Sequence, residues 1–172
     1  MITSSYSIQY GTLNVIISIS FSLMLFFLDK HYQGGAFVNL INFLISLTII
    51  LLAQIAFKKD NGGYLNLSDS LKLGLGISLI NSILGVLFFF ILSNFLDPNM
   101  IEKTLQIVEQ KLIEGNPEIS QQELDTFIEA TRQAMTPFTL STAIIMASLF
   151  FGFLISLITG LFLKKSKTEL FL

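Results

Sequence analysis

Four long apolar runs, each free of charged side chains, constrain this chain more than any other feature of its sequence. They cover about residues 10–28, 37–57, 73–96 and 137–163. About 20 residues of α-helix are needed to cross the hydrocarbon core of a bilayer, which is about 30 Å thick. Because unpaired backbone groups are costly in hydrocarbon, runs of this length cross a membrane as helices. The sequence therefore predicts an all-α fold, with four membrane-spanning helices in a single membrane domain over residues 1–172.

The composition agrees with this interpretation. Hydrophobic residues make up 52% of the chain and charged residues 13%, about half the charged fraction of an ordinary soluble domain. The net charge of −2 provides no basic face for phosphates, so no nucleic-acid partner is expected, and the lipid bilayer is the predicted surrounding. Because the chain has no cysteine, disulfides, thiolate chemistry and Cys-based metal sites are excluded.

Local signals mark the boundaries of the spans. The first run is expected to be a retained span rather than a signal peptide, because residues 1–9 contain no Lys or Arg and no small-residue cleavage site follows. Asp97-Pro98 ends the third span, and Pro137 stands in the first turn of the fourth.

The connection between the second and third spans predicts a tight reversal. Asn61-Gly62-Gly63 supplies residues that tolerate positive backbone φ angles. Ser68 or Asp69 is then expected to cap the helix that follows.

The positions of the basic residues predict an orientation. Four spans place both termini and the loop between the second and third spans on one side of the membrane. That side carries Lys58, Lys59, Lys72, Lys164, Lys165 and Lys167, whereas the other side carries Lys30, Lys103, Lys111 and Arg132. Because positive residues near span ends favour the cytoplasm, the N- and C-termini are predicted to be cytoplasmic.

The segment between the third and fourth spans, about residues 99–135, predicts an amphipathic helical hairpin on the extracytoplasmic side. Apolar residues recur at helical spacing on its first half, namely Ile101, Leu105, Val108 and Leu112. Gly115-Asn116-Pro117 ends that helix, and Ser120 and Glu123 have capping-box spacing at the start of a second. The acidic residues of this loop are Asp97, Glu102, Glu109, Glu114, Glu118, Glu123, Asp125 and Glu129. Because anionic lipid attracts basic helices, the apolar faces are expected to pack on each other or on a partner protein.

Inside the predicted spans the polar residues are small or uncharged. The absence of Asp, Glu, Lys, Arg and His there weighs against a proton-coupled transporter. Small residues recur four apart, as Gly74, Ser78 and Ser82 in the third span and Ser148, Gly152, Ser156 and Gly160 in the fourth. Such ridges let helix backbones approach closely, so they predict helix packing, or self-association through the fourth span. A second hypothesis is a polar cavity lined by the amides of Asn14, Asn42, Gln54 and Asn81.

No arrangement of catalytic, cofactor-binding or metal-binding residues is recognisable. Gly74-x-Gly76 lacks the third glycine of a dinucleotide fingerprint, and the acidic residues of the hairpin lack EF-hand spacing. His31 is the single histidine and is expected to be a solvated residue at a span end. The sequence therefore predicts a non-enzymatic protein without a cofactor.

Several motifs resemble a known family. They are KKDNGGYLNLSDSLKLGLGISLI at residues 58–80, together with Tyr10-Gly11, Asn94-Phe95-Leu96-Asp97-Pro98, Gly115-Asn116-Pro117-Glu118 and Phe150-Phe151-Gly152-Phe153. In order and spacing, this set resembles the domain of unknown function (DUF) 4199 family of small bacterial membrane proteins. The resemblance implies an integral protein of the bacterial inner membrane with four spans, and it transfers no functional residue.

Two functional hypotheses follow. The first is an accessory component that meets a membrane or extracytoplasmic protein partner through the acidic hairpin. The alternative is a small channel or transporter for a neutral solute, which the amides in the spans would favour. A membrane enzyme ranks third, because no carboxylates or hydroxyls are paired at a telling spacing.

Overall fold

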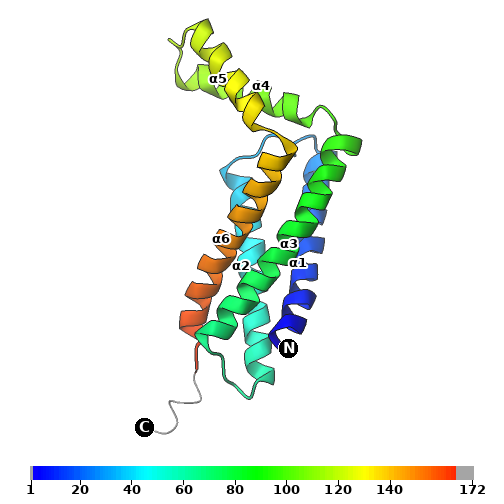
Figure 1. Ribbon diagram of the computed structural model, residues 1–172, viewed down its shortest axis with the longest axis vertical. Coiled ribbons are helices and arrows are strands. Elements are labelled where there is room, and N and C mark those ends of the chain that lie inside the picture. The colour runs from blue at the N-terminus through cyan, green and yellow to red at the C-terminus, as the bar shows by residue number, and fades with distance from the viewer. Residues whose placement is uncertain (1, 166–172) are drawn as a thin grey trace.

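The computed structural model describes residues 2–165, and its regular elements there are all helices (Figure 1). The long helices are α1 (Ile2–Phe27), α2 (Ala36–Asp60), α3 (Leu67–Ile91) and α6 (Pro137–Leu163), and a π-helical turn, η1 (Leu92–Leu96), extends α3. The shorter helices α4 (Met100–Gly115) and α5 (Gln121–Ala134) form a hairpin between α3 and α6. Lys167 lies outside the described residues.

The four predicted spans are confirmed as helices long and apolar enough to cross a membrane: Thr3–Phe27, Ala36–Asp60, Leu67–Leu96 and Pro137–Leu163. Two of them begin earlier than expected, since α1 starts at Ile2 and α3 at Leu67. Tertiary packing accounts for the extra turns of α1. The Tyr6 ring stacks edge-on against Phe57 of α2, with ring centroids 5.7 Å apart.

The helix ends confirm most of the predicted boundary signals and correct one. Gly62 and Gly63 have φ angles of 68° and 86°, as the predicted reversal requires. Pro137 lies in the first turn of α6, and the Thr136 hydroxyl caps that helix by accepting from Thr139 N at 3.1 Å. The cap predicted at Ser68 or Asp69 is wrong, because α3 begins with Asn66 in the cap position and places both residues within its first turn.

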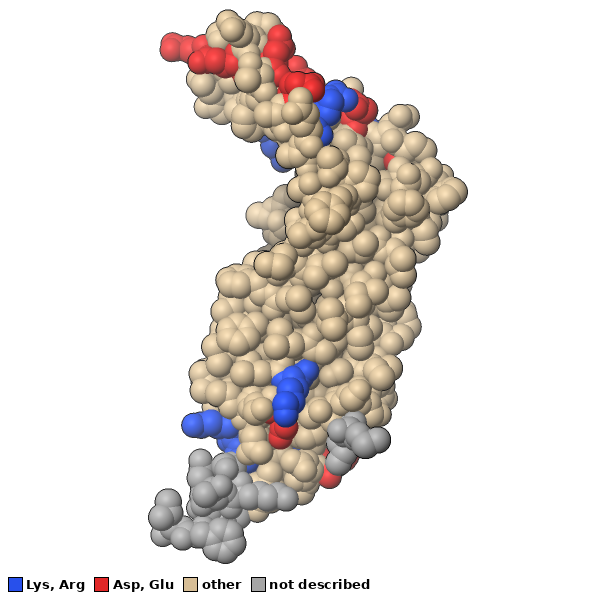
Figure 2. Space-filling model, viewed as in Figure 1, with Lys and Arg blue, Asp and Glu red and all other residues tan. Residues whose placement is uncertain are grey.

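The long helices form a bundle in which α2 and α3 each contact both α1 and α6. Its buried core lies in the half farthest from the hairpin. The buried residues of α2 fall between Ile49 and Phe57, and those of α6 between Gly152 and Gly160. On the face drawn in Figure 2, charged side chains gather at the two ends and leave a broad uncharged band between them. That band is the surface a bilayer would cover.

Specific contacts close the bundle at the end away from the hairpin. Lys58 Nζ donates to the carbonyl oxygen of Leu163 at 2.8 Å, where the last carbonyl groups of α6 lack helical partners. Leu65 and Lys165 exchange two backbone hydrogen bonds of 3.1 and 3.0 Å. These contacts tie the α2–α3 loop to the end of α6.

The hairpin formed by α4 and α5 projects beyond the bundle (Figure 1). Leu105 of α4 and Leu124 of α5 are buried, with 2% and 4% of their surface exposed. The predicted capping box is present at the start of α5, where Ser120 and Glu123 exchange side-chain and backbone hydrogen bonds. Arg132 joins the two helices through a paired contact with the Glu102 carboxylate, including Nη2–Oε2 at 2.9 Å.

Candidate functional site

Small residues bring α3 and α6 into close contact along a seam. Gly152 faces Ser78, so that a Cβ atom built on Gly152 would lie 2.6 Å from the Ser78 Cβ. Gly74 faces Ser156 in the same way, with a built Cβ 2.2 Å from the Ser156 Cβ. The seam therefore leaves no room for a side chain at either glycine.

The seam continues one turn closer to the end of α6. There a Cβ built on Gly160 would lie 2.7 Å from the Ser70 Cβ, and Ser70 Oγ donates to the Ser156 carbonyl oxygen at 2.7 Å. Of the remaining residues in the two predicted ridges, Ser82 is buried and donates to Leu79 O of its own helix, while Ser148 is half-buried. Along this seam, α3 and α6 are therefore held by the close approach of their backbones rather than by interlocking large side chains.

The amides predicted to share one cavity occupy two different environments. Asn14 and Gln54 are buried, with 1% and 0% exposure. Asn14 Oδ1 and both polar atoms of the Gln54 amide have no hydrogen-bond partner within the described chain. A buried polar atom without a partner is energetically costly, so these are positions where water or another polar group would be stabilised.

Asn42 and Asn81 instead line a crevice of about 240 Å³ that all four long helices border. Ser18 and Ser22 of α1 add hydroxyl groups to it, whereas Phe88 of α3 and Ile144 of α6 are among its apolar walls. Asn14 and Gln54 do not line this crevice. The structure thus brings together two of the four predicted amides.

A polar cluster at the hairpin end of the bundle was missed by the sequence analysis. His31 was expected to be solvated, but its side chain is 2% exposed, and Nε2 donates to Asp97 Oδ2 at 2.9 Å. The His31 ring also packs on Phe26 and Tyr32, with centroids 5.2 and 5.1 Å away. The other ring nitrogen, Nδ1, is buried and has no hydrogen-bond partner among residues 2–165. The prediction for His31 is therefore wrong: the loop after α1 folds inward against the residue that ends α3.

Lys103 completes this cluster from the base of the hairpin. Its Nζ donates to Asp97 Oδ2 at 2.9 Å and lies 5.0 Å from the centre of the Tyr32 ring. Burial of the Asp97 carboxyl opposes its ionisation, but the hydrogen bonds from Lys103 and His31 outweigh this effect and lower its pKa. The same Asp97 carboxylate raises the pKa of Lys103. The cluster links the α1–α2 loop, the end of α3 and the start of α4 through one ionised carboxylate.

A topological signal could have found this cluster. With four spans, the α1–α2 loop and the residues after α3 lie at the same end of the bundle. A histidine just after one span and an aspartate just after another are thus confined to the same layer, although they are 66 positions apart.

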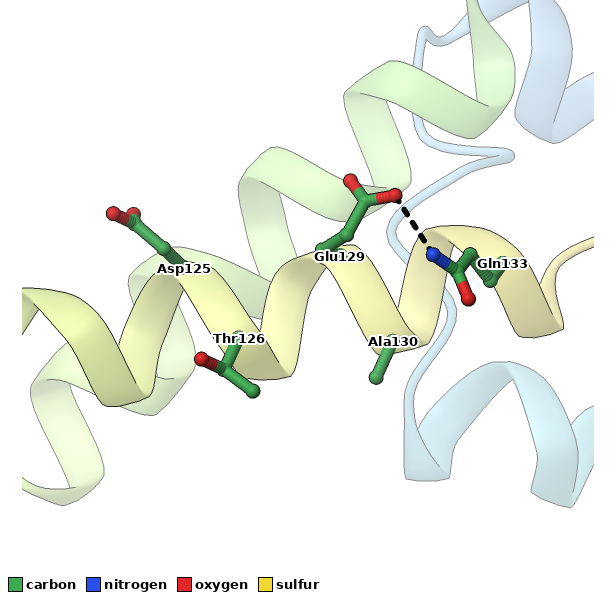
Figure 3. Close-up of a pocket in the computed structure, with 5 residues that line it drawn as sticks. All are labelled: Asp125, Thr126, Glu129, Ala130 and Gln133. Carbon is green, nitrogen blue, oxygen red and sulfur yellow. Dashed lines mark hydrogen bonds between the residues drawn. The ribbon is translucent and has the colours of Figure 1, made fainter.

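The exposed side of α5 presents an acidic surface. Asp125 and Glu129 lie along one edge of the helix, and Gln133 donates to Glu129 at 3.1 Å (Figure 3). Phe127, on the same helix, is 47% exposed. Across residues 2–165, no group of three His, Cys, Asp or Glu side chains is placed to hold a metal ion.

Comparison with known proteins places the chain in a family. No curated protein and no solved structure matches it. The model of the family described as "Protein of unknown function (DUF4199)" matches residues 9–165, which include all the motifs singled out in the sequence. The chain therefore belongs to the DUF4199 family.

Proposed function

We propose that this protein is a non-enzymatic accessory component of the bacterial inner membrane that binds a partner protein through the α4–α5 hairpin. The observation that carries this proposal is the placement of the hairpin, which projects beyond the bundle and contacts it mainly at its base (Figure 1). A segment that only joined two spans would not need two packed helices, the second of them with a capping box.

The hairpin surface defines the chemistry of the partner. Asp125 and Glu129 form an acidic edge, and Phe127 and Ile113 are 47% and 44% exposed. A basic protein surface with an apolar contact fits this combination, because opposite charge steers association while buried apolar area supplies affinity.

The test is crosslinking in intact cells with the full-length tagged protein, followed by mass spectrometry. Charge reversal of Asp125 and Glu129 to arginine is expected to remove a specific partner. Glu118→Arg is the matched control, since Glu118 lies in the exposed turn between the helices. A partner that survives charge reversal and also deletion of residues 99–135 would rule out a role of the hairpin in binding.

The proposed orientation places the hairpin outside the cytoplasm, in accord with the lysines near the opposite end of the bundle. Because the chain lacks cysteine, single substitutions test this directly. Glu118→Cys is expected to react with a membrane-impermeant maleimide in intact cells, and Asn61→Cys only after lysis. The reverse pattern would invert the topology.

A channel or transporter for a neutral solute is the second candidate, favoured by the uncharged polar crevice. Toward the opposite end, however, the core is filled by Ile49, Ile50, Ala53, Ile77 and Ile155. Permeation would therefore require the closely packed half of the bundle to open. Glycerol flux into liposomes that is unaffected by Asn81→Leu and Gln54→Leu would eliminate this candidate.

A further inference from the structure

The crevice lined by Asn42 and Asn81 has the properties of a ligand site. We propose that it binds the headgroup of a neutral lipid, a compact uncharged group that carries carbonyl or hydroxyl oxygens. This inference concerns the membrane-spanning part of the chain and is independent of the partner proposed for the hairpin.

Uneven packing of the bundle creates the space. In the half farthest from the hairpin, glycines and serines hold α3 and α6 in backbone contact. In the other half, Gly85 of α3 has no atom within 4 Å of the position where a Cβ would stand. At the α3–α6 seam, atoms of the facing helix occupy the space beside each glycine. Gly85 instead lines the crevice and faces open space. The helices are thus separated where the crevice lies.

The lining of the crevice selects an uncharged ligand with hydrogen-bonding groups. The side-chain amides of Asn42 and Asn81 make no hydrogen bond within the described chain, and each offers two donors and an acceptor. No Asp, Glu, Lys, Arg or His lines the crevice. An ionised headgroup would therefore lose its hydration without gaining a counter-charge.

The depth of the crevice favours a ligand that arrives from the bilayer. Asn81 lies midway along the span Leu67–Leu96. At a rise of 1.5 Å per residue, Asn42 lies about 9 Å along the helix axis from the start of α2. Phe88, about 10 Å further along α3 than Asn81 at 1.5 Å per residue, and Ile144 of α6 supply apolar contact. A site with a few placed polar groups in a mainly apolar wall is typical of small-molecule binding. A volume of about 240 Å³ accommodates a headgroup but not a whole lipid, whose chains would remain in the bilayer.

Two neutral lipids share this chemistry, an isoprenoid quinone and a diacylglycerol, and the experiment separates them. The full-length protein in phosphatidylcholine vesicles is photolabelled with a diazirine-bearing quinone, a diazirine-bearing diacylglycerol or a diazirine-bearing phosphatidylcholine. Labelled peptides are then identified by mass spectrometry. One neutral probe is expected to label the peptides around Asn42 and Asn81 saturably, with competition by its unlabelled form.

Filling the crevice provides the decisive variant. Gly85→Leu inserts a side chain into the open space without removing any polar group, and it is expected to lower labelling at least about tenfold, the effect of losing ~1.4 kcal/mol of binding. Ser22→Leu fills the crevice from α1 and serves as the second variant if Gly85→Leu misfolds. Thr48→Val is the matched control, because the Thr48 hydroxyl is exposed and donates to Leu44 O of its own helix.

The outcomes divide clearly. Saturable labelling by one neutral probe that both filling variants reduce, and that the control leaves unchanged, supports the site and names the lipid. Equal labelling by the phosphatidylcholine probe would show ordinary contact with the bilayer and would overturn the proposal. Labelling that persists in folded Gly85→Leu protein, or none at these peptides with either neutral probe, would also overturn it.

Discussion

Replacing Gly152 with alanine is expected to destabilise the bundle by about 1–2.5 kcal/mol, although alanine is the better helix former. The added Cβ would lie 1.9 Å from Ser78 Oγ and 2.6 Å from Ser78 Cβ. The hydroxyl can rotate away, but the Cβ is fixed to the backbone of α3. Because carbon atoms pack at about 3.5–4.0 Å, α3 and α6 must separate by roughly 1 Å.

That separation sets the magnitude. Forcing an extra carbon into a closely packed contact costs about 1–3 kcal/mol. The Ser70–Ser156 hydrogen bond, 2.7 Å long, would stretch beyond hydrogen-bonding distance. Hydrogen bonds between membrane helices contribute about 0.6 kcal/mol on average. The gain in helix propensity, about 0.8–1 kcal/mol, offsets part of this loss.

Gly85→Ala is the matched control within α3. It has the same propensity gain and no atom within 4 Å of its added Cβ, so it is expected to be neutral or to stabilise by up to about 1 kcal/mol. Ser78→Gly is the rescue, because it removes the two nearest atoms that the new methyl group would meet and leaves only the Gly74 carbonyl oxygen, 3.3 Å away. Combined with Gly152→Ala, it is expected to restore most of the lost stability.

Reversible unfolding in mixed detergent micelles, followed by circular dichroism, measures the stability of all four variants under one condition. These are Gly152→Ala, Gly85→Ala, Ser78→Gly and the double variant. If Gly152→Ala is no less stable than Gly85→Ala, the α3–α6 seam is not the close contact described above. If Ser78→Gly fails to rescue Gly152→Ala, the cost arises elsewhere, and the steric argument is refuted.

Three further predictions concern the hairpin and its base. Ser120→Ala removes the capping box and is expected to destabilise α5 by about 1 kcal/mol, seen as faster amide exchange confined to its first turn. Leu124→Ala opens a cavity between α4 and α5 and should cost about 2–5 kcal/mol, with loss of hairpin helicity while the bundle is retained; loss of both together would contradict this. Burial raises the pKa of Asp97, but the hydrogen bonds from Lys103 and His31 lower it further than burial raises it. The contribution of these bonds to the free energy of unfolding is therefore fully present above the ordinary carboxyl pKa of about 3.9 and is lost as the pH falls through the lowered value. The midpoint temperature of thermal unfolding should therefore fall in acid. Asp97→Asn should remove part of that acid sensitivity and should lower stability at neutral pH by about 1.5–3 kcal/mol.

The sequence was sufficient to predict the elements that depend on local chemistry. The length of the apolar runs and the absence of charged residues from them predicted the spans. The three-residue spacing of Ser120 and Glu123 predicted the capping box. The cap of α3 was mispredicted because Ser68, Asp69 and Asn66 are all good capping residues within one turn. Local preference cannot choose among them.

The candidate sites depend on partners that are distant in the chain. The ridge pattern identified small faces on two helices, but periodicity does not say which glycine meets which serine, as Gly152 meets Ser78. Likewise Asn42 and Gln54 have the same residue chemistry and lie on one helix, yet one borders a crevice and the other is fully enclosed. That distinction arises from the separation of the helices, which no single segment determines.

The His31–Asp97 contact connects the crevice to the hairpin. Ser22 lies on α1, which leads into the loop of His31, and Phe88 lies on α3, which ends at Asp97. The hydrogen bond between His31 and Asp97 therefore ties two crevice walls at their hairpin ends, and Lys103 attaches the hairpin to the same carboxylate. In the opposite half α1 and α3 are held close, because a Cβ built on Gly76 would lie 2.7 Å from the Ser7 Cβ. Loosening the tie at the hairpin end should therefore widen the crevice rather than shift the whole bundle. In a Ser22→Cys background, Asp97→Asn is expected to speed maleimide modification of the cysteine severalfold, whereas an unchanged rate would show that the hairpin base and the crevice are mechanically independent.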